Sequence, residues 1–328
     1  MAPAHVSIVN YRTGSLVVEC LASLAEQRHA LRGGRVVVVD NASGDQSCDT
    51  IRTAIATRGW SNWVELVESR VNGGFSAGNN VAIARIRASD PSFSTVLLLN
   101  PDTVARPNAL EELLSFMASH APCIAGGSIE DGSGSRERSA HRFPSVLGEL
   151  EAAARLGPLS RRLEKHRPRP ADDAIGRCDW VSGAWMAISR AVLDTIGPLD
   201  EAYFLYFEEV DFCARARCAG FPRWHVPAAR VMHLEGAATG VTIGRRRRPA
   251  YWFESRRRYF VKHHGVLGLA AADVMWSLGR MTLIARRALG LGGRAGMDSE
   301  PASFARDLLV GDLRAFVSGA VWRLPRHV

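Results

Sequence analysis

The sequence predicts an α/β protein: a mainly parallel sheet flanked by helices, followed by a helical, basic C-terminal extension. Two apolar runs, Arg35–Val39 and Thr95–Leu99, show no alternation, which is typical of strands buried on both faces of a parallel sheet. Segments with the apolar spacing of a helix lie between such runs, the first over Leu16–Glu26. From Arg245 onward the chain becomes rich in arginine and then apolar.

Length and composition narrow the possible classes. A chain of 328 residues with 47% hydrophobic content forms one large domain with an appendage or two modest domains. We expect a main domain at residues 1–240 and a C-terminal region at residues 241–328. The net charge of +8 predicts an anionic partner: nucleotide phosphates, an anionic membrane surface or nucleic acid.

Targeting and cysteine signals are weak. The six cysteines include no CxxC pair, so neither a zinc site nor a disulfide framework is expected, and reduced thiols of a cytosolic protein are the simplest interpretation. No charged segment precedes an apolar run at the N-terminus, and no uninterrupted apolar segment is long enough to span a bilayer. We therefore expect neither a secretory signal nor a membrane span.

The remaining elements follow from local patterns. Further strands are predicted at His5–Tyr11, Val64–Glu68, Ile124–Ile129 and Arg223–Val226. Further helices are predicted to start near Gly78, to cover Leu110–Ser119 and Ala191–Ile196, and to begin at the acids near residue 208 and stop at Gly220 and Pro222.

Polar groups follow three of the predicted strands. Asp40 ends the second strand, the loop Asn72–Asn80 follows the third, and Asn100-Pro101-Asp102 follows the fourth. The carboxyl ends of parallel strands are where α/β folds bind ligands, and three independent helix caps explain this repetition less well. The glycines at 74 and 78 permit close backbone approach, and a helix starting near Gly78 presents free N–H groups to an anion, although a plain turn fits equally. The loop is neither GxGxxG nor a P-loop.

An acidic cluster follows an aromatic run. Glu208, Glu209 and Asp211 come directly after Phe204, Tyr206 and Phe207. Carboxylates near apolar rings have raised proton affinity, which suits a general base, and His233 further on is a candidate metal ligand. The alternative is an exposed acidic helix start favoured by the helix dipole, followed by a surface histidine on a strand.

Three other segments leave alternatives open. Trp180 and Trp185 flank Ser182-Gly183-Ala184 and predict either a floor on which a sugar stacks or ordinary core packing. The basic, proline-containing segment Arg155–Arg177 is a mobile loop over a site or a tolerated insertion. The arginines at 245–248 and 256–258, with Lys262, precede the apolar stretch Val266–Gly293, which suits an anionic bilayer surface or a helical cap on the main domain.

Taken together, these pieces resemble the family-2 glycosyltransferases with the GT-A fold, a Rossmann-like nucleotide-diphospho-sugar transferase fold, and in particular the bacterial rhamnosyltransferase-like subgroup. The resemblance covers residues 5–265. It rests on the order and spacing of VSIVNY, VVVVDNASGD, NGGFSAGNN, LLLNPDT, WVSGAWMAISR, FLYFEEVDFCARARCAG, VMH and RRRYFVKHHG.

The resemblance assigns roles to these residues. It implies that Asp40 contacts the nucleobase or ribose of the donor, that Asp102 holds a divalent metal, Mg²⁺ or Mn²⁺, on the diphosphate, and that His233 completes that metal site. The wider nucleotide-sugar site is expected to include Asn10, Tyr11, Asn41, Gly74, Phe75, Gly78, Asn79, Asn80 and Asn100 as well. Trp180, Gly183, Ala184 and Trp185 are expected at the sugar or acceptor pocket.

The acid motif of the family usually reads Glu-Asp-x-Asp, with its second residue as catalytic base. Glu209 occupies that position here, which leaves Glu209 and Asp211 as alternatives, with Glu208 beside them. The resemblance implies an inverting transfer, with dTDP-L-rhamnose as the expected donor and a glycan or polyprenyl-diphosphate-linked acceptor. It also implies a cytoplasmic enzyme, peripheral at the inner face of the cell membrane.

Two other classes compete with this interpretation. A nucleotidyltransferase begins with a glycine-rich loop after its first strand, and Asn10-Tyr11-Arg12-Thr13 provides none. A non-enzymatic adaptor for membranes or nucleic acid leaves the acids without a role, since carboxylates repel phosphate unless a metal intervenes. We therefore expect no nucleic-acid partner. Galactofuranose and N-acetylhexosamine donors stay open beside rhamnose.

Overall fold

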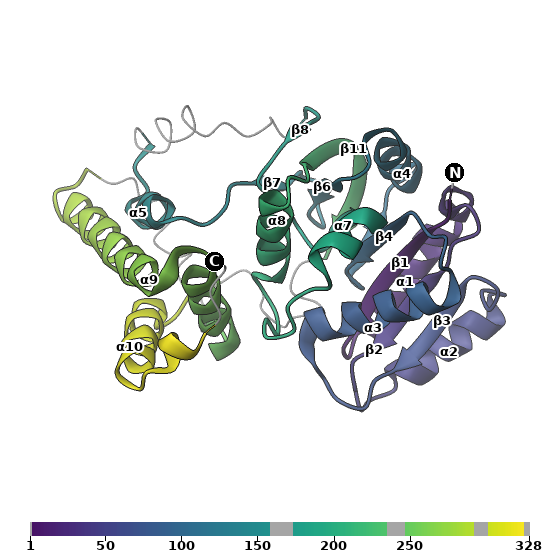
Figure 1. Ribbon diagram of the computed structural model, residues 1–328, viewed down its shortest axis with the longest axis horizontal. Helices are drawn as coiled ribbons and strands as arrows, with labels where there is room; N and C mark the ends of the chain where they lie inside the picture. Colours follow the sequence, from purple (N-terminus) through teal and green to yellow (C-terminus); the bar gives the residue numbers. More distant parts are fainter. Residues whose placement is uncertain (1, 158–172, 235–246, 292–300, 325–328) are drawn as a thin grey trace. The chain divides into compact units, whose positions relative to one another are not determined.

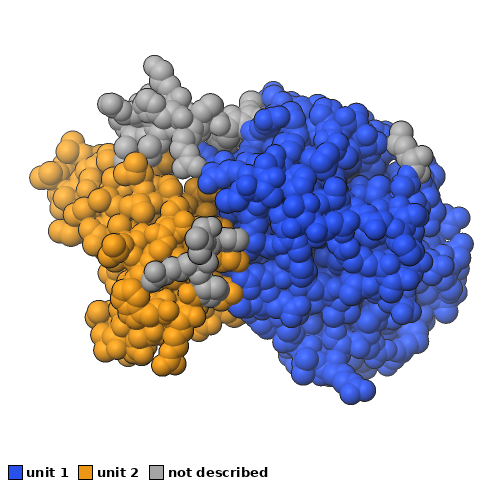
Figure 2. All heavy atoms as spheres, viewed as in Figure 1, with its two compact units in different colours: residues 1–142, 169–204, 208–240 blue, residues 143–168, 205–207, 241–328 orange. Residues whose placement is uncertain are grey.

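The computed structural model describes residues 2–157, 173–234, 247–291 and 301–324. The chain divides into two compact units (Figure 2). The first consists of residues 1–142, 169–204 and 208–240. The second consists of residues 143–168, 205–207 and 241–328, so it includes two segments that precede residue 241.

The first unit is built on a large mixed sheet (Figure 1). Within the described residues the strand order is β3-β2-β1-β4-β10-β6-β11-β5, with β8 also paired to β11. Neighbours β3, β2, β1 and β4 run parallel, as do β6 and β11, whereas β10 is antiparallel to β4 and β6. The strands are β1 (Ala4–Asn10), β2 (Val36–Asp40), β3 (Val64–Glu68), β4 (Thr95–Leu99), β5 (Thr103–Ala105), β6 (Ile124–Glu130), β8 (Gly176–Arg177), β10 (Trp185–Ser189) and β11 (Arg223–His233).

The helices of this unit connect the strands. They are α1 (Gly14–Ala25), α2 (Ser47–Thr57), α3 (Gly74–Ser89), α4 (Ala109–His120), α7 (Arg190–Ile196) and α8 (Glu208–Cys218), with a 3-10 turn η1 (Arg28–Leu31). A two-stranded sheet pairs β7 (Ala140–His141) with β9 (Trp180–Val181). The predicted α/β fold with a mainly parallel sheet is confirmed.

Both faces of the sheet are buried, as the unbroken apolar runs predicted. Val6 and Ile8 of β1 belong to a buried cluster with α1, α2 and α4. Val9, on the opposite face of β1, lies against α3, where a Cβ at Gly78 would be only 2.7 Å from its Cγ1 atom. Gly78 therefore lets α3 approach the sheet closely.

Two elements differ from their predicted bounds in ways that matter for the site. Helix α3 begins at Gly74, four residues before the predicted start. Strand β11 continues past Val226 to His233, because a bulge between Val226 and Arg230 absorbs Pro227, which has no N–H to donate. His233 is thus the last residue of a sheet strand.

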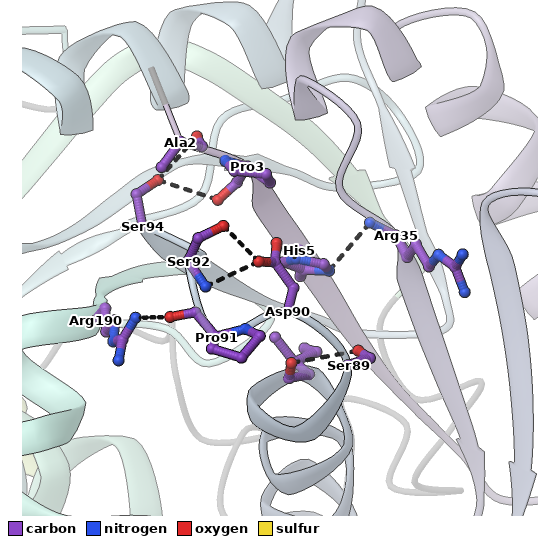
Figure 3. A network of polar contacts seen from close by, with 11 residues as sticks. Ala2, Pro3, His5, Arg35, Ser89, Asp90, Pro91, Ser92, Ser94 and Arg190 are labelled. Carbon is purple, nitrogen blue, oxygen red and sulfur yellow. Dashed lines mark hydrogen bonds and ion pairs between the residues drawn. The ribbon is translucent and has the colours of Figure 1, made fainter.

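The amino-terminal edge of the sheet carries a closed polar network (Figure 3). His5 Nδ1 accepts a hydrogen bond from the Arg35 N–H at 3.1 Å, and His5 Nε2 lies 3.0 Å from Asp90 Oδ2. Asp90 Oδ1 also accepts bonds from the hydroxyl and N–H of Ser92 at 2.6 and 2.9 Å. The bonds from Ser92 and His5 lower the Asp90 pKa to about 2. Each of these polar groups has a partner, so the network joins β1, β2 and the end of α3.

The described part of the second unit is helical: α5 (Val146–Ala154), α9 (Ala250–Ala288), α10 (Phe304–Val317) and the 3-10 turn η2 (Ala320–Arg323). Helix α9 is interrupted at Gly265, whose φ of 71° and ψ of 174° are not helical. Its second half packs closely on α5, because a Cβ at Gly279 would lie 2.7 Å from the Leu150 carbonyl oxygen. Of the segment 155–177, residues 158–172 lie outside the described residues.

A buried ion cluster holds the second unit together and corrects the predicted basic surface. Arg256 is 1% exposed, and its guanidinium lies within 2.9–3.2 Å of carboxylate oxygens of Glu149, Asp273 and Asp312. Arg257 also pairs with Asp312, at 2.6 Å. Arginines 256 and 257 therefore bind acids inside the unit, and Lys262 is buried too. Arg245 and Arg246 lie outside the described residues.

Candidate functional site

The carboxyl ends of β1 and β2 bring Asn10 and Asp40 together. The two residues are register partners in the parallel pair. Asn10 Nδ2 donates to Asp40 Oδ1 at 2.6 Å, and Asp40 also accepts bonds from the hydroxyl and N–H of Ser43. Tyr11 follows at the surface, 37% exposed, with the Arg12 guanidinium 5.1 Å from its ring centroid. A rigid polar floor thus lies beside an accessible aromatic ring.

The loop after β3 is held by the loop after β2. Asn41 Nδ2 donates to Asn72 Oδ1 and to the Gly74 carbonyl, both at 2.9 Å. Gly74 has φ of +82°, and a Cβ there would lie 2.1 Å from the Phe204 carbonyl oxygen. That oxygen accepts the Phe75 N–H at 2.7 Å. Glycine is required at 74 both by the backbone conformation and by the approach of Phe204.

Three residues expected to face the nucleotide make internal contacts instead. Gly78 packs on β1, as described above. Asn79 is 1% exposed and bonds to Ser7 and to the Phe75 carbonyl. Asn80 bonds through both its amide groups to Leu199. The prediction of a helix start near Gly78 is wrong; the free N–H groups of α3 belong to its first turn, at Gly74 and Phe75.

Strand pairing places His233 beside Asp102. His233 and Thr103 are partners in the antiparallel pair of β11 with β5, and the Leu234 N–H donates to the Asp102 carbonyl at 2.9 Å. His233 Nε2 consequently lies 3.1 Å from Asp102 Oδ1 and 3.2 Å from Asn100 Nδ2. The sequence separates these residues by more than 130 positions, and the fold unites them at one edge of the sheet.

The donor set fits a divalent cation bound with help from a ligand. Asp102 is 3% exposed, and it supplies an oxygen beside an imidazole nitrogen. Mg²⁺ and Mn²⁺ are commonly held by one or two protein groups plus substrate phosphates and water. In the described part of the chain no group of three or more histidine, cysteine or acidic side chains is placed to hold a metal alone. Asp102 and His233 could therefore supply two ligands of a cation whose other positions are filled by phosphate oxygens and water.

The loop 182–184 connects this pair to the acidic cluster. The Ala184 carbonyl accepts the Asn100 N–H at 3.1 Å. A Cβ at Gly183 would lie 3.3 Å from the Phe75 ring and 3.6 Å from Glu209 Cβ. Gly183 thus lies against both Phe75 and Glu209. Its neighbour in the loop, Ala184, makes the contact with Asn100.

The first two acids of α8 have buried carboxylate oxygens. Within the described residues, no hydrogen-bond partner reaches Glu208 Oε2 or Glu209 Oε2. Burial raises the pKa of Glu209 to about 7; burial and the neighbouring Glu209 raise the pKa of Glu208 well above its usual value. Glu208 is 4% exposed, whereas Glu209 retains partial exposure. Glu209 is therefore the residue of this pair that combines partial exposure with a proton affinity suited to base chemistry near neutral pH.

The backbone just before these acids is strained. Tyr206 and Phe207 both have positive φ, at 70° and 67°, which bulky residues rarely adopt. Such conformations persist only where surrounding structure enforces them, and they concentrate at functional sites. Here they deliver the chain into α8 with Glu208 and Glu209 in its first turn.

Asp211 has a different task. It is fully buried and accepts a bond from Arg215 Nε at 2.9 Å. The same guanidinium donates to the carbonyls of Ile196 and Pro198 at 2.6 and 2.8 Å. Asp211 therefore orients Arg215, which ties α8 to the end of α7, and it presents no accessible oxygen.

The two tryptophans do not form a sugar floor together. Trp185 is 1% exposed, lies in the main core and donates from Nε1 to the Ala229 carbonyl, so its assignment to the acceptor pocket is wrong. Its position on β10 between β4 and β6 explains the burial. Trp180 stacks on His141 with ring centroids 4.1 Å apart and donates to the Arg142 carbonyl. Core packing, the alternative interpretation, holds for Trp185.

The sequence did not indicate the residues that hold the candidate site residues in place by hydrogen bonds. Ser43 bonds to both Asn10 and Asp40, and Arg12 donates from its backbone N–H and its side chain to Ser43. Asn72 accepts bonds from Asn41 and from the Gly74 N–H. Ser43 and Asn72 are polar residues in loops that carry other candidates, whereas nothing in the local sequence singles out Arg12.

Solved structures with a similar fold indicate the class of protein. Similar solved structures are a mannosyltransferase from Pyrobaculum calidifontis in complex with GDP-Man and Mn²⁺, and GalNAc-T7 with UDP, GalNAc and Mn²⁺. The TM-score is 0.56 for both, at 16% and 15% identity; the matches cover 99% of this chain and 81% and 58% of those chains. At these identities the likeness concerns the fold, which is the GT-A fold of glycosyltransferases.

The family follows from the sequence comparison. The family described as glycosyltransferase like family 2 matches residues 2–251, and the chain belongs to it. N-acetylglucosaminyl-diphospho-decaprenol L-rhamnosyltransferase of Mycobacterium tuberculosis H37Rv is 30% identical over 250 residues, 72% of this chain and 77% of the relative. Rhamnosyltransferase WbbL of Escherichia coli K12 is 25% identical over 166 residues, 49% and 60% of the two chains. The chain is a glycosyltransferase related to rhamnosyltransferases.

Proposed function

We propose that the protein is an inverting transferase that moves L-rhamnose from dTDP-L-rhamnose onto a hydroxyl of a lipid-linked glycan acceptor. The donor and acceptor are inferred from the two rhamnosyltransferase relatives, one of which acts on a diphospho-decaprenol. The observation that carries the chemistry is Glu209, a partly exposed residue whose carboxyl group has a raised pKa and which lies beside Gly183 and Phe75.

Glu209 acts as the general base. Its ionised carboxylate takes the proton from the acceptor hydroxyl as that oxygen bonds to the anomeric carbon and the nucleoside diphosphate leaves from the opposite face. A base with a pKa near 7 combines a useful ionised fraction with high proton affinity. Gly183 leaves room beside Glu209 Cβ that a larger side chain would fill. Asp211 serves as a positioning residue through Arg215.

The donor lies along the carboxyl edge of the first strands. Asp40 and Asn10 face the nucleoside, Tyr11 offers a ring for stacking, and Asp102 with His233 holds a divalent metal. When bound, that metal neutralises charge on the leaving diphosphate. The close fit at Gly74 keeps the start of α3 near the backbone at Phe204, where its free N–H groups favour an anion.

The second unit supplies a membrane-facing surface. The most exposed large side chains on the second half of α9 are Leu267, Val274, Leu278, Met281 and Ile284, at 45–84% exposure. The acid of this segment, Asp273, points instead into the ion cluster around Arg256. A helix whose exposed large side chains are apolar and whose acid lies inward is the reverse of a water-facing helix. We assign this face to the interface of a lipid bilayer, with anionic lipids favoured by the chain's positive charge.

The helix lies on the bilayer in this proposal. By length and composition α9 is long and apolar enough to cross a membrane, since an 18-residue window within it has a mean hydropathy of 1.2. This finding corrects the expectation that the chain has no such segment. Crossing would separate Asp273 from Arg256 and Gly279 from its contact with α5. A buried unpaired charge is far more costly than an interfacial position.

A donor panel tests the proposed function. Purified protein is incubated with acceptor lipid and dTDP-L-rhamnose, a UDP-galactofuranose or UDP-N-acetylglucosamine, each with Mg²⁺, with Mn²⁺ or with EDTA. We expect metal-dependent transfer from dTDP-L-rhamnose alone, with inversion at the anomeric carbon. Transfer from another sugar donor would overturn the rhamnose assignment, and transfer in EDTA would overturn the metal assignment.

A further inference from the structure

The second unit contains a cavity that the transfer chemistry does not use. Its volume is about 650 Å³, and it lies between the start of α9 and one face of α10, which pack side by side (Figure 1). The cationic lining comprises Arg247, Arg248, Arg257, Arg306 and Arg314. Two acids, Glu254 and Asp307, also line it, with the apolar Phe253 and Val310.

Ion pairs neutralise only part of this charge. Arg247 binds Asp307 through two bonds of 2.6 Å, and Arg257 binds Asp312 at 2.6 Å. This leaves Arg248, Arg306 and Arg314 in a lining that holds one further acid, Glu254. Among the described residues Arg306 and Arg314 form no salt bridge, although Asp307 attracts Arg306 electrostatically. The buried Nε of Arg248 has no hydrogen-bond partner there, and its guanidinium lies 4.7 Å from the Trp252 ring centroid. Clustered cations repel one another unless an anion is present, and planar guanidinium groups suit phosphate oxygens.

Helix α10 carries two neighbouring rows of different character. Arg306, Val310 and Arg314 line the cavity at intervals of four residues, so they share one face. The adjacent row, Leu309, Leu313 and Val317, is exposed, at 36%, 61% and 83%. A cationic row beside an exposed apolar row matches a ligand with an anionic head and a hydrocarbon chain.

We propose that this cavity binds the diphosphate of a polyprenyl-diphosphate-linked acceptor, with the isoprenoid chain along the 309, 313 and 317 row. Two features support the assignment. The uncompensated arginines suit a multiply charged phosphate group, and Gly311 leaves space in the lining next to the Arg257 guanidinium, where a Cβ would lie 3.3 Å from its terminal nitrogen. The identity of the lipid rests on the proposed function, whereas binding of a phosphate-type anion does not.

Binding to the full-length chain in EDTA tests the site with defined probes. Farnesyl diphosphate, inorganic pyrophosphate and farnesol are titrated by calorimetry, because EDTA prevents metal-dependent binding at Asp102. We expect farnesyl diphosphate to bind more tightly than pyrophosphate, and farnesol to bind weakly. The double variant Arg306→Gln with Arg314→Gln should weaken both diphosphates at least about tenfold, since it removes two charge-assisted contacts without breaking an ion pair.

Two matched variants make the result specific. Arg323→Gln changes an exposed arginine of the same unit outside the cavity and should leave both affinities unchanged. Leu309→Ser with Leu313→Ser should weaken farnesyl diphosphate alone. Equal affinity for the two diphosphates would overturn the lipid assignment, and unchanged binding in the double arginine variant would overturn the assignment of the anion to this cavity.

Loss of binding in Asp102→Ala would place the anion at the donor site instead. If no donor supports transfer yet these affinities behave as expected, the proposed function fails and the anion site stands.

Discussion

Replacing Glu209 by glutamine removes a base without changing its size. The carboxylate has a pKa of about 7, so roughly one tenth of it is ionised at pH 6 and roughly nine tenths at pH 8. The wild-type kcat should therefore rise about tenfold over this interval at saturating donor and acceptor. Glu209→Gln should lower kcat by roughly 10²–10⁴-fold and abolish that rise, since positioned general bases contribute this much.

The same substitution that lowers kcat should raise the free energy of unfolding toward high pH. An unfolded glutamate ionises near 4.5, whereas folded Glu209 ionises near 7, so between these values the folded state binds more protons. The wild-type free energy of unfolding consequently falls as pH rises from 4.5 to 7, by roughly 3 kcal/mol from this group. Glu209→Gln lacks this loss, so denaturant titrations should show it gaining stability relative to wild type toward pH 8.

An exposed carboxylate provides the control. Glu19→Gln on the exposed face of α1 removes one negative charge and should alter neither the pH profile of kcat nor that of stability. A folded Glu209→Gln variant with wild-type kcat would exclude Glu209 as the base. A wild-type rate that does not depend on pH between 6 and 8 would exclude it as well.

Three further outcomes follow from the structure. Asp102→Ala should abolish the Mn²⁺-dependent part of donor binding in calorimetry while His233→Ala weakens it less, because water and phosphate can fill the histidine position; unchanged affinity in Asp102→Ala would remove the metal assignment. Arg256→Met should lower the free energy of unfolding by about 3–5 kcal/mol in denaturant titrations, because it leaves acids buried without their cation; a loss below about 1 kcal/mol would contradict the importance of the cluster. Leu278→Glu with Met281→Glu should reduce sedimentation with vesicles containing phosphatidylglycerol and leave the far-UV circular dichroism unchanged; undiminished sedimentation would exclude this face as the membrane contact.

The sequence by itself determined the layers of the fold and indicated the edge of the sheet at which we place the donor. Unbroken apolar runs such as Thr95–Leu99 can only be buried on both faces, so they predict parallel strands covered by helices. Asp40 and Asp102 were found because the fold places the carboxyl ends of its parallel strands at one edge. The acids that follow an aromatic run marked Glu208, Glu209 and Asp211 as candidates, and only the family resemblance placed Glu209 at the position of the base.

Only the tertiary structure distinguishes the surroundings of each polar residue. The sequence places Glu209 and Asp211 two positions apart with the same kind of side chain, yet Asp211 is fully buried against Arg215 whereas Glu209 is partly exposed. The arginine block divides likewise: Arg256 enters an ion cluster whose acids come from three helices. Arg248 of the same block instead lines a cavity. Local patterns encode helix and strand, but the pairing of a charge depends on residues distant in the chain, and that pairing separates a structural charge from a functional one.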